Sequence, residues 1–367
     1  MHIGSIIIIS ERIIVHLTNH ANVSELLDDI KYIQRIDKSN MFSCVERFPK
    51  QLEESLSGSS RLGCDVNKVC ICGMGGSAIA GDIVSEYLSE RSDVIVSVVR
   101  SMRLPAWVDD DTLTIIISYS GNTRETLELF NDASTLDSPL IAITSGGELR
   151  ERCERRNVPV VIIPPGIQPR AAIGHSLGAI ASVLDVVGIS TPRSTLTSLL
   201  KDLTTFKDAL VPGVPTSLNL AKHVAKMLHD RTPIVYAPKS IKPAAIRWQT
   251  QINENAKIMA FSGEIPEMNH NQIVGWIEDE SVRKCVPVVL NSGSCGDLMK
   301  RIVEKTVEIL VENGLDPVLV EVPGEDNLSA MLHAIIVGDF VSCYLAILRG
   351  VDPTPVASIQ ELKRRIG

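Results

Sequence analysis

Short apolar runs rich in β-branched residues alternate with helix-length amphipathic segments along most of the chain. This alternation predicts parallel strands connected by helices, in a sheet that helices cover on both faces. Two such series follow one another without a sequence repeat of fixed period, so we expect an α/β fold with two units of similar plan. The predicted strands are 69–72, 94–98, 113–117, 140–144 and 160–163 in the first series and 233–237, 286–290 and 318–322 in the second.

Helical patterns precede and separate the two series. Residues 22–60 have a helical pattern with a capping break at 37–40. A second helical stretch, 184–226, is interrupted by the proline-rich VPGVP at 211–215, which favours a domain boundary there. The predicted division is an N-terminal extension with helices over 1–60, a first domain over 61–190, a helical linker over 191–215, a second domain over 216–350 and a C-terminal helix over 351–367.

Composition limits the partners. The chain has 367 residues, 44% of them hydrophobic, which is enough for a sizeable core in each of two domains. A net charge of −8 argues against nucleic acid as a partner, because nucleic-acid-binding proteins usually show a basic stripe. We expect no apolar run of the roughly 18 residues that span a bilayer, and therefore no membrane association.

The first 20 residues carry an apolar patch that Glu11 and Arg12 interrupt, and no small-residue cleavage site follows it. This pattern predicts a strand-like extension or a mis-assigned start, with the functional chain beginning in effect near Asn22. Eight cysteines are scattered along the chain without a CxxC pair, so we expect no zinc site and no other metal or cofactor. Buried free thiols in a cytoplasmic protein are the default, and intracellular disulfides are the alternative for a hyperthermophilic source.

Two serine- and glycine-rich segments follow predicted strands and lead into predicted helices, CICGMGGSAIAGD at 70–82 and IIISYSGNTRETL at 115–127. Main-chain amides point outward at such turns, and a helix N-terminus favours an anion. Neither segment has the GKS of a P-loop or the full G-x-G-x-x-G of a dinucleotide site, so the pair suits one phosphoryl group on a small molecule. The alternative is turns that only let each helix pack on its strand. The candidate phosphate ligands are Gly75, Gly76, Ser77, Ser118, Ser120 and Thr123.

A dense polar segment in the second series, 247–276, contains candidates for proton transfer. Glu254 lies in a helical context whose apolar neighbours predict burial, and burial would make its carboxylate a better proton acceptor near neutral pH. The alternative is an ordinary helix carboxylate paired with Lys257 or Arg247. The apolar neighbours are Ile246, Trp248, Ile252, Ala256 and Met259.

His270 lies in the loop-like PEMNHNQ, and an imidazole can move a proton in either direction near neutral pH. A lone histidine is more often a surface or hydrogen-bonded residue. Glu264 and Glu267 are rivals of Glu254, in a loop that we expect to be more exposed.

Arg170 follows a predicted strand and a proline-constrained turn, and its guanidinium can stabilise an oxyanion on a substrate. A salt bridge that fixes the turn is the equal alternative. His175 has the pattern of a packed residue at a helix start. In the C-terminal segment, Lys363 on a predicted amphipathic helix is a candidate for contact with a sugar or phosphate, or a solvated helix-end charge.

The motifs GMGGSAIAGD, SYSGNTRETL, PPGIQPRAA, NENAK, NHNQIVGW and VDPTPV, in this order from about Val23 to the C-terminus, resemble those of the bifunctional phosphoglucose/phosphomannose isomerases. This family belongs to the phosphoglucose isomerase superfamily, which is built on sugar isomerase (SIS) domains. The resemblance implies two flavodoxin-like SIS domains and a homodimer with active sites near the subunit interface. The first 20 residues depart from the family pattern.

The resemblance also implies a mechanism and roles. The turn hydroxyls would hold the 6-phosphate of a sugar, and Glu254 would move a proton between C2 and C1 through a cis-enediol without a metal. His270, from the neighbouring subunit, and Lys363 would help open the ring, and Arg170 would stabilise the enediolate. A threonine that gives room to the mannose epimer is assigned to Thr354.

The sequence is also compatible with other functions of the same fold. A SIS domain can act as a regulatory module that senses a phosphosugar, although residues 1–60 show no helix-turn-helix pattern and no basic charge. A glutamine-dependent aminotransferase would need an amidotransferase domain, for which we find no pattern. Another phosphosugar isomerase, an epimerase or a deaminase could share both the phosphate site and the base.

Overall fold

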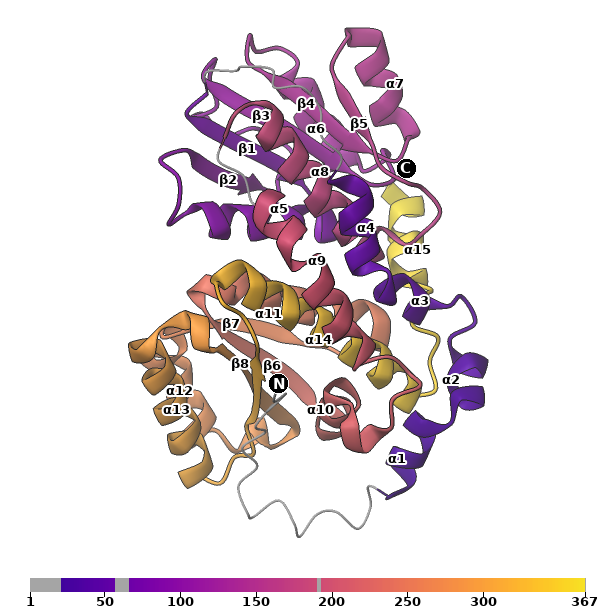
Figure 1. Cartoon of the computed structure of the whole chain (residues 1–367), viewed down its shortest axis with the longest axis vertical. Helices are drawn as coiled ribbons and strands as arrows, with labels where there is room; N and C mark the ends of the chain where they lie inside the picture. The colour runs from indigo at the N-terminus through magenta and orange to yellow at the C-terminus, as the bar shows by residue number, and fades with distance from the viewer. Residues whose placement is uncertain (1–20, 57–65, 190–192, 367) are drawn as a thin grey trace. The chain divides into compact units, whose positions relative to one another are not determined.

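The computed structural model describes residues 21–56, 66–189 and 193–366, so the predictions for residues 1–20 and for Cys64 lie outside the described residues (Figure 1). Contacts within the chain divide it into two compact units. One comprises Arg47–Thr204 and is called here the β1–β5 unit; the other comprises Met1–Glu46 and Thr205–Gly367 and is called the β6–β9 unit.

The β1–β5 unit contains a five-stranded parallel sheet in the order β2-β1-β3-β4-β5 (Figure 1). All five strands predicted for the first series are present, and the central strand β3 is buried along its whole length. The strands are β1 Lys68–Gly73, β2 Ile95–Val99, β3 Thr112–Ser118, β4 Leu140–Thr144 and β5 Val160–Ile162.

Helices cover both faces of this sheet. Successive side chains of a strand point to opposite faces, so Cys70 and Cys72 face one side of β1 and Ile71 the other. The two cysteines belong to a buried cluster with residues of α6 and α7, while Ile71 lies under Gly81 of α5. The helices of this unit are α4 Phe48–Ser55, α5 Gly75–Leu88, α6 Arg124–Ala133, α7 Gly147–Arg156, α8 Ile173–Val186 and the first part of α9 Arg193–Asp208.

The β6–β9 unit contains a four-stranded parallel sheet in the order β7-β6-β8-β9. Three of its strands were predicted, namely β6 Thr232–Pro238, β8 Cys285–Ser292 and β9 Val318–Val322. The strand β7 Phe261–Ile265 was not predicted, because its sequence FSGEI has no β-branched run and it lies at the sheet edge with an exposed first residue. The α/β fold predicted from the sequence is confirmed.

Helix α14, Asn327–Leu348, forms the centre of the β6–β9 unit. It is 22 residues long and apolar enough to cross a membrane, which corrects the expectation that no apolar run has that length. Its hydrophobic window is fully buried, as in the core helix of a globular domain. The other helices of this unit are α1 Ala21–Asp28, α2 Ile30–Ile36, α3 Met41–Glu46, α10 Leu220–Leu228, α11 Lys242–Gln251, α12 Gln272–Glu278, α13 Asp297–Glu312 and α15 Ala357–Ile366.

Candidate active site

The first serine turn connects β1 to α5. Gly75 has a left-handed φ of +53°, a conformation that L side chains rarely adopt. A Cβ on Gly76 would lie 3.2 Å from the Cα of Arg170 and 3.4 Å from the carbonyl oxygen of Pro169. The main chain of this turn therefore approaches the Arg170 turn closely, and Ser77 follows it as a buried residue.

The second serine turn connects β3 to α6. Ser118, the last residue of β3, is 2% exposed, and its hydroxyl has no hydrogen-bond partner among the described residues. The amide of Asn122 donates to the Ser120 hydroxyl at 3.2 Å. Thr123 is the N-cap residue of α6, but its side chain makes no capping hydrogen bond. A buried hydroxyl without a partner is costly and marks a place where a ligand can supply the missing contact.

The two turns lie at the same edge of the sheet. Strands β1 and β3 are parallel neighbours, with Gly73 paired to Ile117 at their carboxyl ends. Ligands of open parallel sheets bind beyond these ends of the strands. The six predicted phosphate ligands, Gly75, Gly76, Ser77, Ser118, Ser120 and Thr123, all fall in these two turns or at their limits.

Sequence reasoning missed a third turn at the same edge, after β4. A Cβ on Gly121 would lie 1.8 Å from the carbonyl oxygen of Gly146, and Gly121 has φ +68°. Ser145 donates from its hydroxyl to the Tyr119 carbonyl at 2.6 Å. The third turn therefore supports the second serine turn. Its signal in the sequence is the Gly146-Gly147 pair, which follows a predicted strand after a single serine.

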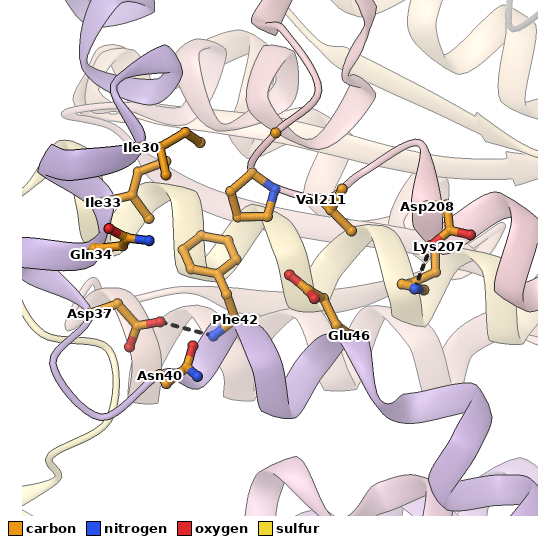
Figure 2. Close-up of a pocket in the computed structure, with 12 residues that line it drawn as sticks. Ile30, Ile33, Gln34, Asp37, Asn40, Phe42, Glu46, Lys207, Asp208 and Val211 are labelled. Carbon is orange, nitrogen blue, oxygen red and sulfur yellow. Dashed lines mark hydrogen bonds and ion pairs between the residues drawn. The ribbon is translucent and has the colours of Figure 1, made fainter.

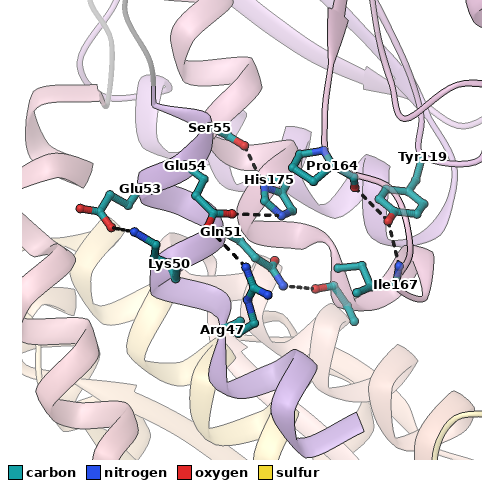
Figure 3. Close-up of polar contacts among 11 residues, drawn as sticks. Arg47, Lys50, Gln51, Glu53, Glu54, Ser55, Tyr119, Pro164, Ile167 and His175 are labelled. Atoms are coloured by element: carbon teal, nitrogen blue, oxygen red, sulfur yellow. Dashed lines mark hydrogen bonds and ion pairs between the residues drawn. The ribbon is translucent and has the colours of Figure 1, made fainter. Parts of the chain in front are cut away.

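Tyr119 also has a role that the sequence pattern did not indicate. Its hydroxyl donates to the Pro164 carbonyl at 3.0 Å and accepts from the Ile167 amide at 3.2 Å (Figure 3). These contacts hold the loop that leads to Arg170, which lies 4% exposed in the short helical turn Pro169–Ala171. The residue that begins the second serine turn thus also orders the arginine loop.

Helix α4 holds the same loop on another side. Gln51 donates to the Ala171 carbonyl at 2.9 Å, and Ser55 shares a hydrogen bond of 2.9 Å with the Nδ1 of His175 (Figure 3). Burial lowers the pKa of His175, and the nearby Glu54 acts in the opposite direction. The expectation that His175 is a packed residue at a helix start is confirmed, since it lies buried in the first turn of α8.

In the β6–β9 unit, Glu254 lies in a π-helical turn, Ile252–Ala256, that continues α11. Single π turns occur frequently at functional sites. The predicted apolar surroundings are present at Trp248, Ile252 and Ala256, all fully buried, but Met259 is 64% exposed because it follows the end of the helix. Glu254 itself is half-buried.

Arg247 and Lys257, the two cations that the sequence offers as partners of Glu254, make well-defined contacts in this unit. Arg247 forms a buried two-point ion pair with Asp339, with nitrogen–oxygen distances of 2.9 and 2.7 Å. The ammonium of Lys257 donates to main-chain oxygens, among them that of Glu254 at 2.6 Å.

His270 is exposed at the end of a short helical turn, Glu267–His270. Glu264 and Glu267, the alternatives to Glu254 as the base, differ in their exposure. Glu264 is half-buried and pairs with Lys242 at 2.8 Å, which corrects the expectation of an exposed residue, whereas Glu267 is exposed and accepts from the Asn271 amide group at 2.8 Å.

The C-terminal segment begins with the predicted turn, in which the Thr354 amide donates to the Asp352 carboxylate at 2.9 Å. Lys363 is exposed on α15. The residues of the predicted apolar face of α15 are also exposed: Ile359, Leu362 and Ile366.

A pocket in the β6–β9 unit lies between α2, α3 and the segment that follows α9, and it contains none of the predicted site residues (Figure 2). Burial raises the pKa of two carboxyls on its wall, Asp37 and Glu46. Asp37 has a structural role there, because it accepts from the amides of Met41 and Phe42 and so caps α3. Within the part of the chain that the structure describes, no three His, Cys, Asp or Glu side chains gather as metal ligands would.

Comparison with known proteins covers most of the chain. Residues 64–163 match the SIS domain family, and residues 217–366 match the bacterial phospho-glucose isomerase C-terminal SIS domain family. The chain is 34% identical over 336 residues to the bifunctional phosphoglucose/phosphomannose isomerase of Caldicellulosiruptor bescii, covering 89% of this chain and 98% of the relative. It belongs to the bifunctional phosphoglucose/phosphomannose isomerase family. The resemblance seen in the sequence motifs is thus confirmed.

Other members of this family are similar to the chain to the same degree. The bifunctional phosphoglucose/phosphomannose isomerase of Aquifex aeolicus is 34% identical to it, covering 81% of this chain and 90% of the relative. Solved structures share the fold. A glucose-6-phosphate isomerase-like protein from Thermus thermophilus has a TM-score of 0.61 at 19% identity, covering 92% of this chain and 98% of that one. A glucose-6-phosphate isomerase from Chlamydia trachomatis has a TM-score of 0.66 at 14% identity, covering 88% of this chain and 72% of that one.

Proposed function

We propose that this chain interconverts glucose 6-phosphate and mannose 6-phosphate with fructose 6-phosphate, the activity that the names of its bifunctional relatives describe. The observation that carries the proposal, beside family membership, is the pair of serine turns at the carboxyl ends of β1 and β3. At the second turn the buried Ser118 hydroxyl has no hydrogen-bond partner among the described residues. Such an arrangement fits one phosphoryl group and offers it main-chain amides and hydroxyls.

Phosphate binding is assigned to the β1–β5 unit. The amides of Gly75 and Gly76 and the hydroxyl of Ser77 come from one turn, and the hydroxyls of Ser118, Ser120 and Thr123 from the other. Arg170 stabilises the negative charge that develops on the sugar oxygen, which a buried guanidinium does without reorganisation. Its close approach to Gly76 supports a role beside the phosphate turn.

Proton transfer is assigned to the β6–β9 unit. After ring opening, assisted by His270 and Lys363, Glu254 removes the proton from C2 of the aldose, and the negative charge that moves to the C1 oxygen is stabilised by Arg170. The proton of the C2 hydroxyl passes to the C1 oxygen through the cis-enediol, and Glu254 returns its proton to C1, so that C2 becomes the ketone. Protons and electrons balance within the sugar, so the mechanism needs no redox cofactor. Arg170 supplies the charge stabilisation that a metal would otherwise give.

Further assignments rest on the family resemblance. We assign to Thr354 the role of giving room to the mannose epimer. We also propose that the enzyme is a homodimer in which His270 reaches into the partner's site, and that it is located in the cytoplasm. The exposure of His270 and of the apolar face of α15 supports an assembly in which these surfaces meet another chain. The domain limits drawn from the sequence, 61–190 and 216–350, remain part of this proposal.

A second candidate reaction comes from one relative. The chain is 29% identical over 253 residues to the D-glucosamine-6-phosphate 4-epimerase of Sulfolobus acidocaldarius, covering 69% of this chain and 78% of the relative. Such an enzyme could share the phosphate site while acting at another carbon. Assays with glucosamine 6-phosphate beside fructose 6-phosphate separate the two reactions.

The base assignment has a matched test in two half-buried glutamates of the same unit. We expect Glu254→Gln to retain sugar-phosphate binding and to lose turnover by about a thousandfold, within the range of a positioned acid–base group. Glu264→Gln, which changes the rival carboxylate paired with Lys242, should keep most of the turnover. The reverse outcome would transfer the role of base to Glu264.

A further inference from the structure

Four consecutive main-chain carbonyls at the end of the Glu254 turn accept hydrogen bonds from two cationic side chains. The Nζ of Lys257 donates to the carbonyls of Glu254 at 2.6 Å and Asn255 at 3.3 Å. The Nη1 of Arg349 donates to the carbonyls of Ala256 and Lys257, each at 2.6 Å. The last carbonyls of a helix have no partner within the helix, so these two cations provide the hydrogen bonds that end the turn.

The main chain at Lys257 has an unusual conformation. Its φ of +57° and ψ of +33° lie in the left-handed region, which a residue with a long side chain adopts only where its surroundings hold it. Contacts on both sides of Glu254 supply such surroundings. The side-chain oxygen of Asn253 accepts from the Ala260 amide at 2.8 Å, and the fully buried Asn255 donates to the Ser342 hydroxyl at 2.9 Å.

Lys257 also reaches beyond the turn. Its Nζ donates to the carbonyl of Pro353 at 2.9 Å, 96 positions further along the chain. One ammonium therefore ties the main chain of Glu254 to the segment between α14 and α15. Glu254 is half-buried, and its main-chain carbonyl is held by this ammonium.

We propose that Lys257 is a positioning residue for the isomerase, one that holds the main chain of Glu254 so that its carboxylate meets the C1–C2 edge of the sugar. This inference rests on the proposed function, in which Glu254 moves the proton. A general base must be held to within about half an ångström, and misplacement by about 1 Å can cost a hundredfold in rate. Binding of the phosphate is assigned to other residues, so it should not depend on Lys257.

The test compares wild-type protein with Lys257→Met, which keeps the stem and removes the donors. We expect kcat with fructose 6-phosphate to fall about ten- to a hundredfold with KM changed less than about twofold. Lys257→Arg restores donors and should recover part of the kcat. Lys305→Met, which removes an equally positive side chain that pairs with Glu308 on α13 of the same unit, should leave kcat unchanged.

Lys257→Gly gives a second route if Lys257→Met folds poorly, because glycine adopts the left-handed conformation without strain. It removes the ammonium all the same, so we expect the same loss of kcat and faster hydrogen exchange of the amides in 252–258. Wild-type kcat in folded Lys257→Gly or Lys257→Met would overturn the inference. A wild-type protein without isomerase activity would instead contradict the proposed function, and the exchange measurement would still report whether Lys257 holds the turn.

Discussion

Removal of the Ser118 hydroxyl should change the stability and the phosphate affinity of this protein in opposite directions. The hydroxyl is buried at the end of β3 and has no hydrogen-bond partner among the described residues. An unsatisfied buried polar group costs about 1–3 kcal/mol, so Ser118→Ala should raise the free energy of unfolding of the ligand-free protein by an amount in this range. Functional sites often carry such a cost.

The same variant should bind phosphate more weakly. A hydrogen bond to a charged group contributes about 1.5–3 kcal/mol, which corresponds to a loss of about 10–150-fold in affinity. Urea denaturation without ligand gives the stability. The rise of the unfolding temperature with increasing inorganic phosphate or fructose 6-phosphate gives the affinity, since a ligand stabilises the folded state by RT ln(1 + [L]/Kd).

Thr114 provides a matched control in the same strand. It lies four positions before Ser118, on the same face of β3, and its buried hydroxyl also lacks a partner among the described residues. Thr114→Val should stabilise the ligand-free protein in the same way and leave the phosphate affinity unchanged. A role of the Ser118 hydroxyl in phosphate binding is contradicted if Ser118→Ala binds phosphate as tightly as wild type, or if it loses affinity only to the extent that Thr114→Val does.

Two further predictions concern the support of the site. Gly121→Ala combines a left-handed φ with a Cβ 1.8 Å from the Gly146 carbonyl oxygen, so a denaturant titration should show a free energy of unfolding lower by about 2–5 kcal/mol. The control is Gly188→Ala, which has φ +83° and open space around it and should lower the free energy of unfolding by about 1–2 kcal/mol. Equal losses in the two variants would show that the contact with Gly146 is unimportant. Burial lowers the pKa of His175, so the unfolded chain takes up a proton at a pH at which the folded chain does not. The free energy of unfolding should therefore fall by up to about 1.4 kcal/mol per pH unit as the pH drops below about 6.5. His175→Asn should flatten this dependence, and an unchanged pH profile of unfolding would contradict it.

The sequence was sufficient for features that depend on local pattern. Eight of the nine strands that the described residues form follow from β-branched runs, and both serine turns follow from glycine and hydroxyl residues placed directly after such runs. The exception, β7, is stabilised by pairing with β6 at a sheet edge, and this pairing leaves no hydrophobic period in FSGEI. Local pattern also overestimated the burial around Glu254, because the chain leaves the helix at Lys257 and exposes Met259.

The supports of the site could not be predicted because they join positions that are distant in the sequence. Arg349 reaches the carbonyls of Ala256 and Lys257 from more than 90 positions away, and Gln51 reaches the Ala171 carbonyl from 120 positions away. No spacing rule applies to such pairs. Tyr119 reads as a simple strand-end aromatic in the sequence, and only the fold shows that its hydroxyl holds the arginine loop.

The isomerase activity itself is tested by incubating the purified protein with fructose 6-phosphate, with and without a chelator. Glucose 6-phosphate and mannose 6-phosphate are quantified separately. We expect both products to appear, at rates that the chelator does not change. Formation of neither product, with the sugar phosphate bound but unconverted, would contradict the isomerase activity and favour a binding or sensing role.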